Sequence, residues 1–177
     1  STPDQPLRLA WALRVSGTIR ESAGTYDEAV ADLEAAIGLF EDASRRDDPE
    51  HARALTALAL CFDHLGDYPR ALPLLERAYT QYRAVHGELH PLTTDAQNAL
   101  AVAQDRLHQY DAAEDNYLTA LANAQRLYGD AHPVIGEIQG NIGRLYSHME
   151  RWDESHRFYE LTLATTRAVY GERHHYV

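Results

Sequence analysis

The segment HGELHPLTT, residues 86–94, recurs along the chain at a fixed interval. Residues 128–136 read YGDAHPVIG, 42 positions later, and residues 170–177 read YGERHHYV after another 42. Each copy places a glycine and then a histidine after a histidine or tyrosine. A period between about 20 and 50 residues is typical of solenoid proteins, whose repeats stack on one another.

The two histidines of the first copy, His86 and His90, raise the question of a metal site. Residues at the second histidine's position precede a predicted helix start in every copy, and they are Asp48, His90, His132 and His174. Aspartate is a good N-cap, and a residue before proline avoids helical geometry. A zinc site needs three or four converging ligands, and this segment offers two. We therefore predict a turn or cap residue and no metal site.

Apolar residues between these segments keep helical spacing, which predicts two antiparallel helices in each copy. Glycines such as Gly87 and Gly129 fall where the second helix must end with a left-handed residue, and prolines such as Pro91 fall where the next helix begins. The predicted helices are 7–22, 27–44, 50–65, 69–86, 92–107, 111–128, 134–149 and 153–170.

The small residues Ala59, Ala71 and Ala78, with Leu58, Gly66, Tyr68 and Leu75 between them, resemble the tetratricopeptide repeat family. The 42-residue period with G-x-x-H-P resembles its kinesin-light-chain variety. The resemblance implies an all-α, right-handed α-α superhelix, a solenoid of four helical hairpins. It also implies a single array over 1–177, with repeats at 7–48, 49–90, 91–132 and 133–174. The chain begins without methionine and stops as a fifth repeat begins, so we expect a fragment of a longer chain.

Three positions depart from this pattern. His108 and Glu150 replace the glycine found at Gly24 and Gly66, and Arg45 stands where the other copies have the glycine at the helix end.

Composition excludes several functions. The formal net charge of -11 and pI near 5.3 argue against a nucleic-acid partner. All basic residues are arginine, which indicates a bacterial coding sequence, and the lack of lysine excludes a Walker A loop and a Schiff base. We expect no cofactor. With one cysteine, no leader and no long apolar stretch, we expect a cytoplasmic protein that does not enter a membrane.

Two groups of residues invite a catalytic interpretation. Cys61 and His64 lie three apart, but the position of Cys61 holds Ile19, Ala103 and Leu145 in the other copies, which predicts a core cysteine. The pairs Asp47–Asp48 and Glu114–Asp115 fall near predicted helix starts, where carboxylates cap helices and favour the helix dipole. No nucleophile has a base and an orienting group, so we predict no catalytic residue and no enzyme.

The resemblance implies a peptide-binding groove lined by the first helix of each repeat. Its predicted residues are Arg14, Arg53, Thr56, Leu60, His64, Asn98, Val102, Arg106, Asn141, Arg144 and His148. Leu60 and Val102 belong to an apolar floor, the asparagines can bind a peptide main chain, and the arginines can contact acidic side chains. Five acids offset the arginines: Glu21, Asp63, Asp95, Asp105 and Glu137.

We therefore predict a non-catalytic scaffold that binds an extended peptide or partner segment. The alternative also rests on the resemblance, because arrays of this family often form part of larger bacterial signalling ATPases and transcription regulators. The chain would then be a sensor or autoinhibitory arm of such a protein. The last hairpin has apolar residues at Phe158, Leu161 and Val169 without a following repeat, which predicts self-association through the C-terminal end.

Overall fold

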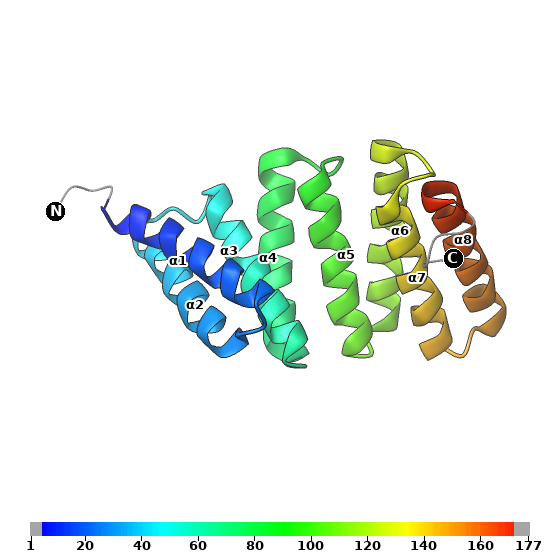
Figure 1. Ribbon diagram of the computed structural model, residues 1–177, viewed down its shortest axis with the longest axis horizontal. Helices are drawn as coiled ribbons and strands as arrows, with labels where there is room; N and C mark the ends of the chain where they lie inside the picture. Colours follow the sequence, from blue (N-terminus) through cyan, green and yellow to red (C-terminus); the bar gives the residue numbers. More distant parts are fainter. Residues whose placement is uncertain (1–4, 172–177) are drawn as a thin grey trace. The chain divides into compact units, whose positions relative to one another are not determined.

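The computed structural model describes residues 5–171, and this part of the chain contains eight α-helices and no strand (Figure 1). The helices are α1 (Gln5–Ser22), α2 (Tyr26–Asp42), α3 (Pro49–His64), α4 (Tyr68–His86), α5 (Pro91–Arg106), α6 (Tyr110–Tyr128), α7 (Pro133–His148) and α8 (Trp152–Tyr170). The predicted all-α fold is confirmed. None of these helices combines the length and the apolar character that crossing a bilayer requires.

The described residues fall into two compact units, which divide between Val85 and His86. In unit 1, α1 packs on α2, and α3 packs on both α1 and α2. In unit 2, α5 packs on α6, α7 packs on α8, and α6 and α7 contact each other (Figure 1). Each unit therefore repeats one arrangement, in which the second helix of a hairpin is covered by the first helix of the next.

The helix starts follow from residues at one repeat position. Asp48 Oδ1 accepts a hydrogen bond from the Glu50 backbone N–H at 3.0 Å, as an N-cap of α3. His90 Nδ1 and His132 Nδ1 accept the equivalent bonds, each at 3.3 Å, at the starts of α5 and α7. The predicted cap role is thus confirmed for these three residues, whereas His174 lies outside the described residues.

In two copies, the residue before the glycine packs on the capping histidine. The rings of His86 and His90 stack with centroids 4.2 Å apart, and those of Tyr128 and His132 stack at 4.3 Å. This contact joins the end of one second helix to the start of the next first helix, which explains why the position favours an aromatic ring.

The helix ends depend on positive φ. Gly129 has φ 75° and ψ 177°, so the φ is positive as predicted, but the residue occupies a region that is essentially restricted to glycine rather than the left-handed helical region. Arg45 cannot adopt this geometry without strain. Accordingly α2 ends at Asp42, two residues before the predicted 44, and Ser44 takes φ 55° instead.

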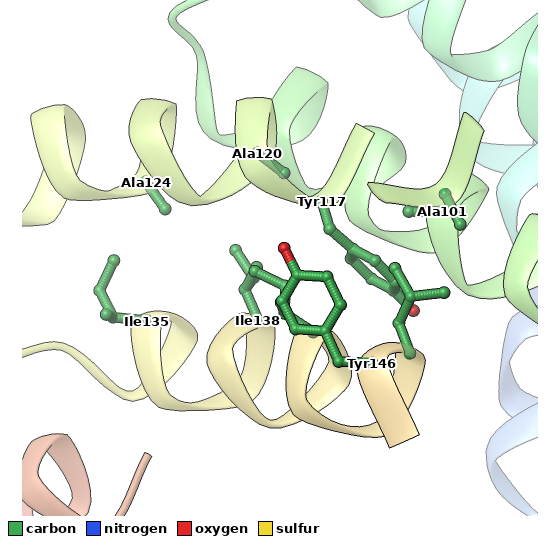
Figure 2. Close-up of a cluster of buried hydrophobic side chains, with 10 residues drawn as sticks. Ala101, Tyr117, Ala120, Ala124, Ile135, Ile138 and Tyr146 are labelled. Carbon is green, nitrogen blue, oxygen red and sulfur yellow. The ribbon is translucent and has the colours of Figure 1, made fainter. Parts of the chain in front are cut away.

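The core of unit 2 lies between α6 and α7 (Figure 2). Tyr117, Ala120 and Ala124 of α6 face Ile135 and Ile138 of α7, and all five side chains are fully buried. The alanines allow the two helices to approach closely, and Tyr117 fills the space that they leave.

Candidate protein-binding surface

The predicted groove residues lie on the first helices, α1 and α3 in unit 1 and α5 and α7 in unit 2. We call the sides of these helices that carry the predicted residues the first-helix surface of each unit. In unit 1, Arg14 and Arg53 converge on Glu50, a residue that the sequence pattern did not single out. Arg14 Nε lies 2.5 Å from Glu50 Oε2, and Arg53 Nη1 lies 2.6 Å from Glu50 Oε1. One carboxylate thus partly neutralises two guanidinium groups.

His64 is also engaged within unit 1. Its Nε2 lies 3.4 Å from Glu21 Oε1, and its ring stacks on Tyr26 with centroids 4.8 Å apart. Thr56 donates its hydroxyl to the Ala52 carbonyl of the same helix at 3.0 Å. Leu60, in contrast, is 40% exposed, so it offers an apolar contact on the first-helix surface of unit 1.

Two asparagines meet on the first-helix surface of unit 2. Asn141 Nδ2 donates to Asn98 Oδ1 at 3.3 Å, and Asn98 Nδ2 donates to Glu137 Oε1 at 3.2 Å. Val102 is partly buried against the core of unit 2, and Arg106 is exposed at the end of α5. Desolvation and the nearby charge of Glu137 raise the pKa of Asp95. This surface therefore combines amide groups with two carboxylates that repel each other.

Asp105 is the one acid of the predicted set that is fully buried. His148 Nδ1 lies 2.7 Å from Asp105 Oδ1, and Arg144 Nε lies 3.4 Å from Asp105 Oδ2. The Glu21–His64 pair of unit 1 occupies the equivalent positions two repeats earlier. In each pair the acid and the histidine are 43 residues apart. An acid near the end of one first helix thus holds a histidine of the next, and this spacing was the sequence signal for the pairing.

A cavity of about 390 Å³ in unit 1, which the sequence pattern did not predict, lies beside the buried His51. His51 Nδ1 lies 3.0 Å from Gln81 Oε1, and Gln81 Nε2 donates to the Asp48 carbonyl at 2.9 Å. Burial alone would raise the pKa of Glu41, but the hydrogen bond from Arg77 and nearby positive charges hold it below its ordinary value. The Gln81 contacts tie α3 and the loop before it to α4, and the contact between Arg77 and Glu41 ties α2 to α4.

The residues that invited a catalytic interpretation are buried or hydrogen-bonded within the fold. Cys61 is fully buried, and burial together with the charge of Glu21 raises its pKa to about 11. The prediction of a core cysteine is confirmed. Glu114 accepts hydrogen bonds from the Tyr146 hydroxyl at 2.7 Å and from Arg151 Nη1 at 2.9 and 3.0 Å. Within residues 5–171, no group of three or more histidine, cysteine, aspartate or glutamate residues could hold a metal ion.

We expect the stability of unit 1 to fall as pH rises from about 9 to 11, because of Cys61. An unfolded thiol ionises near pH 8.5, whereas the folded thiol, with a pKa of about 11, stays mostly protonated until the upper end of this range. The unfolded chain therefore loses a proton that the folded chain keeps, and ionisation favours unfolding. Urea unfolding at several pH values measures this effect. Cys61→Ala should remove it and leave the contribution of the tyrosines, so identical pH profiles for the two proteins would contradict the assignment.

Consecutive helical hairpins with repeated caps define a helical-repeat protein. The tetratricopeptide repeat model matches residues 8–84, 64–126 and 106–168, and the chain belongs to this family. The resemblance predicted from the sequence is thereby confirmed. Repeats of this family generally mediate interactions between proteins.

Solved structures show the same fold. BtubC (BKLC) from P. vanneervenii superposes with a TM-score of 0.78 at 22% identity, covering 98% of this chain and 68% of that chain. A Podosopora anserina protein described as a kinesin light chain with nearly identical TPR-like repeats gives 0.81 at 21% identity, covering 97% and 81%. Aspartyl phosphate phosphatase F from Bacillus subtilis gives 0.74 at 14% identity, covering 92% of this chain and 41% of that chain. No curated protein sequence matches the chain.

Proposed function

We propose that the chain is a non-catalytic protein-interaction module, which binds an extended segment of a partner on its first-helix surfaces. The observation that carries this proposal is the Asn98–Asn141 pair on the first-helix surface of unit 2. A primary amide has two N–H groups, and each of these residues uses one of them in the contacts described above. The second N–H of each side chain is left for the main chain of a partner.

The charged residues of the first-helix surfaces indicate which side chains a partner segment would carry. Arg14 and Arg53 share Glu50, and Arg144 contacts Asp105, so these cations have internal partners. Asp95 and Glu137 instead repel each other. A basic side chain of the partner would relieve this repulsion, and the formal net charge of -11 would attract such a segment. We infer that the segment is basic or uncharged, and that salt weakens its binding.

Leu60 supplies an apolar contact in unit 1 that can be tested without disturbing the core, because the side chain is exposed.

We also propose a cytoplasmic location, where a single thiol such as Cys61 remains reduced.

The test is to capture partners from lysate, map the bound segment by cross-linking, and titrate a synthetic peptide of that segment. Asn141→Ala removes one neutral hydrogen bond, which is worth about 0.5–1.5 kcal/mol, and should weaken binding roughly two- to tenfold. Leu60→Asp should weaken it further, because it places a charge against the apolar contact.

The matched control is Arg157→Ala on α8, a second-helix position that is exposed and lies outside both first-helix surfaces. This variant should bind within about twofold of the unmodified chain. Unchanged binding by both Asn141→Ala and Leu60→Asp, or a preference for acidic over basic peptides, would contradict the proposal.

A further inference from the structure

We propose that the cavity beside His51 in unit 1 binds a small organic anion, whose carboxylate or phosphate group is held by Arg46 and Arg77. The cavity is lined by α4 and by the buried side of α3, where His51 is 2% exposed and Leu55 is 1% exposed. It is therefore separate from the first-helix surface of unit 1, and its ligand is distinct from the partner segment proposed above.

The cavity has the size and the lining of a small-molecule site. Its volume of about 390 Å³ falls within the range of about 300–1,000 Å³ that is usual for such sites. Leu55 and Ala84 give it an apolar part, and the side chains of Arg46 and Arg77 give it a charged part. An organic anion has the same division into an apolar body and a charged group.

The basic residues of this cavity are peculiar to the second repeat. At the positions of Arg46, His51 and Arg77, respectively, the other copies have Asp4, Glu88 and Asp130; Leu9, Thr93 and Ile135; and Ala35, Thr119 and Leu161. None of these residues is basic, so the packing of the repeats does not require a basic residue at any of the three positions. Their gathering in a chain with a formal net charge of -11 favours a separate role, the attraction of a negative ligand.

Both arginines have N–H groups left for a ligand. Arg77 Nη2 forms an ion pair with Glu41 Oε1, and Arg46 Nη2 lies 3.7 Å from Glu41 Oε2. Each guanidinium has five N–H groups, whereas a carboxylate has about four acceptor sites. Glu41 therefore cannot satisfy both side chains. Since both are also exposed to solvent, an incoming anion can reach them.

The buried ring of His51 has one nitrogen without a hydrogen bond. Gln81 Nε2 donates to the Asp48 carbonyl, so Gln81 Oε1 accepts from His51 Nδ1–H at 3.0 Å. His51 Nε2 has no hydrogen-bond partner in the described part of the chain, because Glu41 Oε1 lies 3.6 Å away. Buried polar atoms of this kind are rare, and a bound ligand is one explanation for them. A bound anion would accept a hydrogen bond from Nε2 once the ring takes up a proton from solvent.

Anion binding should therefore be coupled to protonation of His51. The charged groups around this ring and its cavity are Glu41 of α2, Glu76 and Arg77 of α4, and Arg46 of the loop before α3. A bound anion adds a negative charge to this set and favours the protonated ring. By linkage, the protonated ring binds the anion more tightly, so binding should tighten roughly two- to tenfold from about pH 8 to about pH 6.

The experiment is a titration of the purified chain with benzoate, followed by two-dimensional amide NMR spectra in a buffer free of phosphate and sulfate. We expect saturable shifts of amides around Leu55 and Gln81, with a Kd on the order of 1 mM for a ligand of this size. Phenyl phosphate in place of benzoate shows which of the two anionic groups the site prefers. Benzyl alcohol has a similar body without charge, and it should bind at least about tenfold more weakly.

Arg46→Gln and Arg77→Gln should each weaken benzoate binding about three- to tenfold, because each removes charge-assisted hydrogen bonds at a partly exposed site. The matched control is Arg70→Gln. Arg70 Nη2 of α4 lies 3.0 Å from Glu34 Oε1 of α2, an ion pair between the same two helices, and its loss should change binding by less than about twofold. Glu41→Gln should tighten binding roughly twofold or more, because it releases Arg77 for the ligand.

Circular dichroism melts establish that each variant is folded. If Arg77→Gln is not, Arg46→Gln decides the test, because the Arg46 side chain is 72% exposed. The proposal would be overturned by an unmodified chain without saturable shifts, or by equal losses from Arg70→Gln and the cavity arginine variants. Loss of binding in a folded Glu41→Gln variant, or tighter benzoate binding at the higher pH, would also overturn it.

Discussion

Replacing Tyr117 with alanine is expected to lower the free energy of unfolding of unit 2 by about 3–5 kcal/mol. Tyr117 is the largest fully buried side chain of the described residues, and it belongs to the cluster that includes Ala101 and Ile138 (Figure 2). Its removal leaves a cavity between α6 and α7 that neighbouring alanines are too small to fill. Urea unfolding followed by Trp152 fluorescence in a Trp11→Phe background reports on unit 2.

The matched control is Leu118→Ala, one residue further along α6. Leu118 is 40% exposed, so its truncation removes little buried surface and should cost well under about 1 kcal/mol. Similar losses for the two variants would mean that α6 presents a different face to α7 than the one described.

The helices could be predicted from sequence because their boundaries depend on local signals. A capping residue followed by Pro49, Pro91 or Pro133 starts each later first helix where it was expected, within one residue. Glycine ends α6 and α8 at the predicted residues. The prediction was wrong by two residues for α2, where Arg45 replaces glycine and the chain turns earlier through Ser44.

The contacts of the candidate site could not be predicted in the same way. Arg14 and Arg53 were expected to face a partner, but both form ion pairs with Glu50. A long arginine side chain can reach any carboxylate within several ångströms. The choice depends on how neighbouring first helices are spaced. Sequence alone gives the 43-residue interval between Asp105 and His148, but not the burial that makes the pair important.

Exposure of a repeat position depends on whether a neighbour covers it. Ile19 and Leu145 share one position and are both apolar, yet Leu145 is fully buried under α6 and Ile19 is exposed. Periodicity predicts which side of a helix is apolar, and the number of stacked neighbours decides whether that side is buried. End repeats are therefore where sequence patterns mislead.

Arg144→Ala is expected to lower the free energy of unfolding of unit 2 by about 2–4 kcal/mol. Removing one partner of a fully buried ion pair costs about 3–5 kcal/mol, and the loss is reduced here because Arg144 is partly exposed and His148 still contacts Asp105. Chemical denaturation measures the change, with Arg157→Ala, exposed on α8, expected to stay within about 0.5 kcal/mol.

A double-mutant cycle separates the pair from general damage to the helix. Asp105→Ala alone should also destabilise, because it leaves Arg144 and His148 without their shared carboxylate. The double variant should cost less than the sum of the two single variants, since neither unpaired charge remains buried. Additive losses would show that Arg144 and Asp105 act independently, and would make Arg144 available to a partner. If the losses are coupled, the effect of Arg144→Ala on partner binding has to be measured under conditions in which this variant remains folded, because Arg144 then supports the structure of the proposed binding surface.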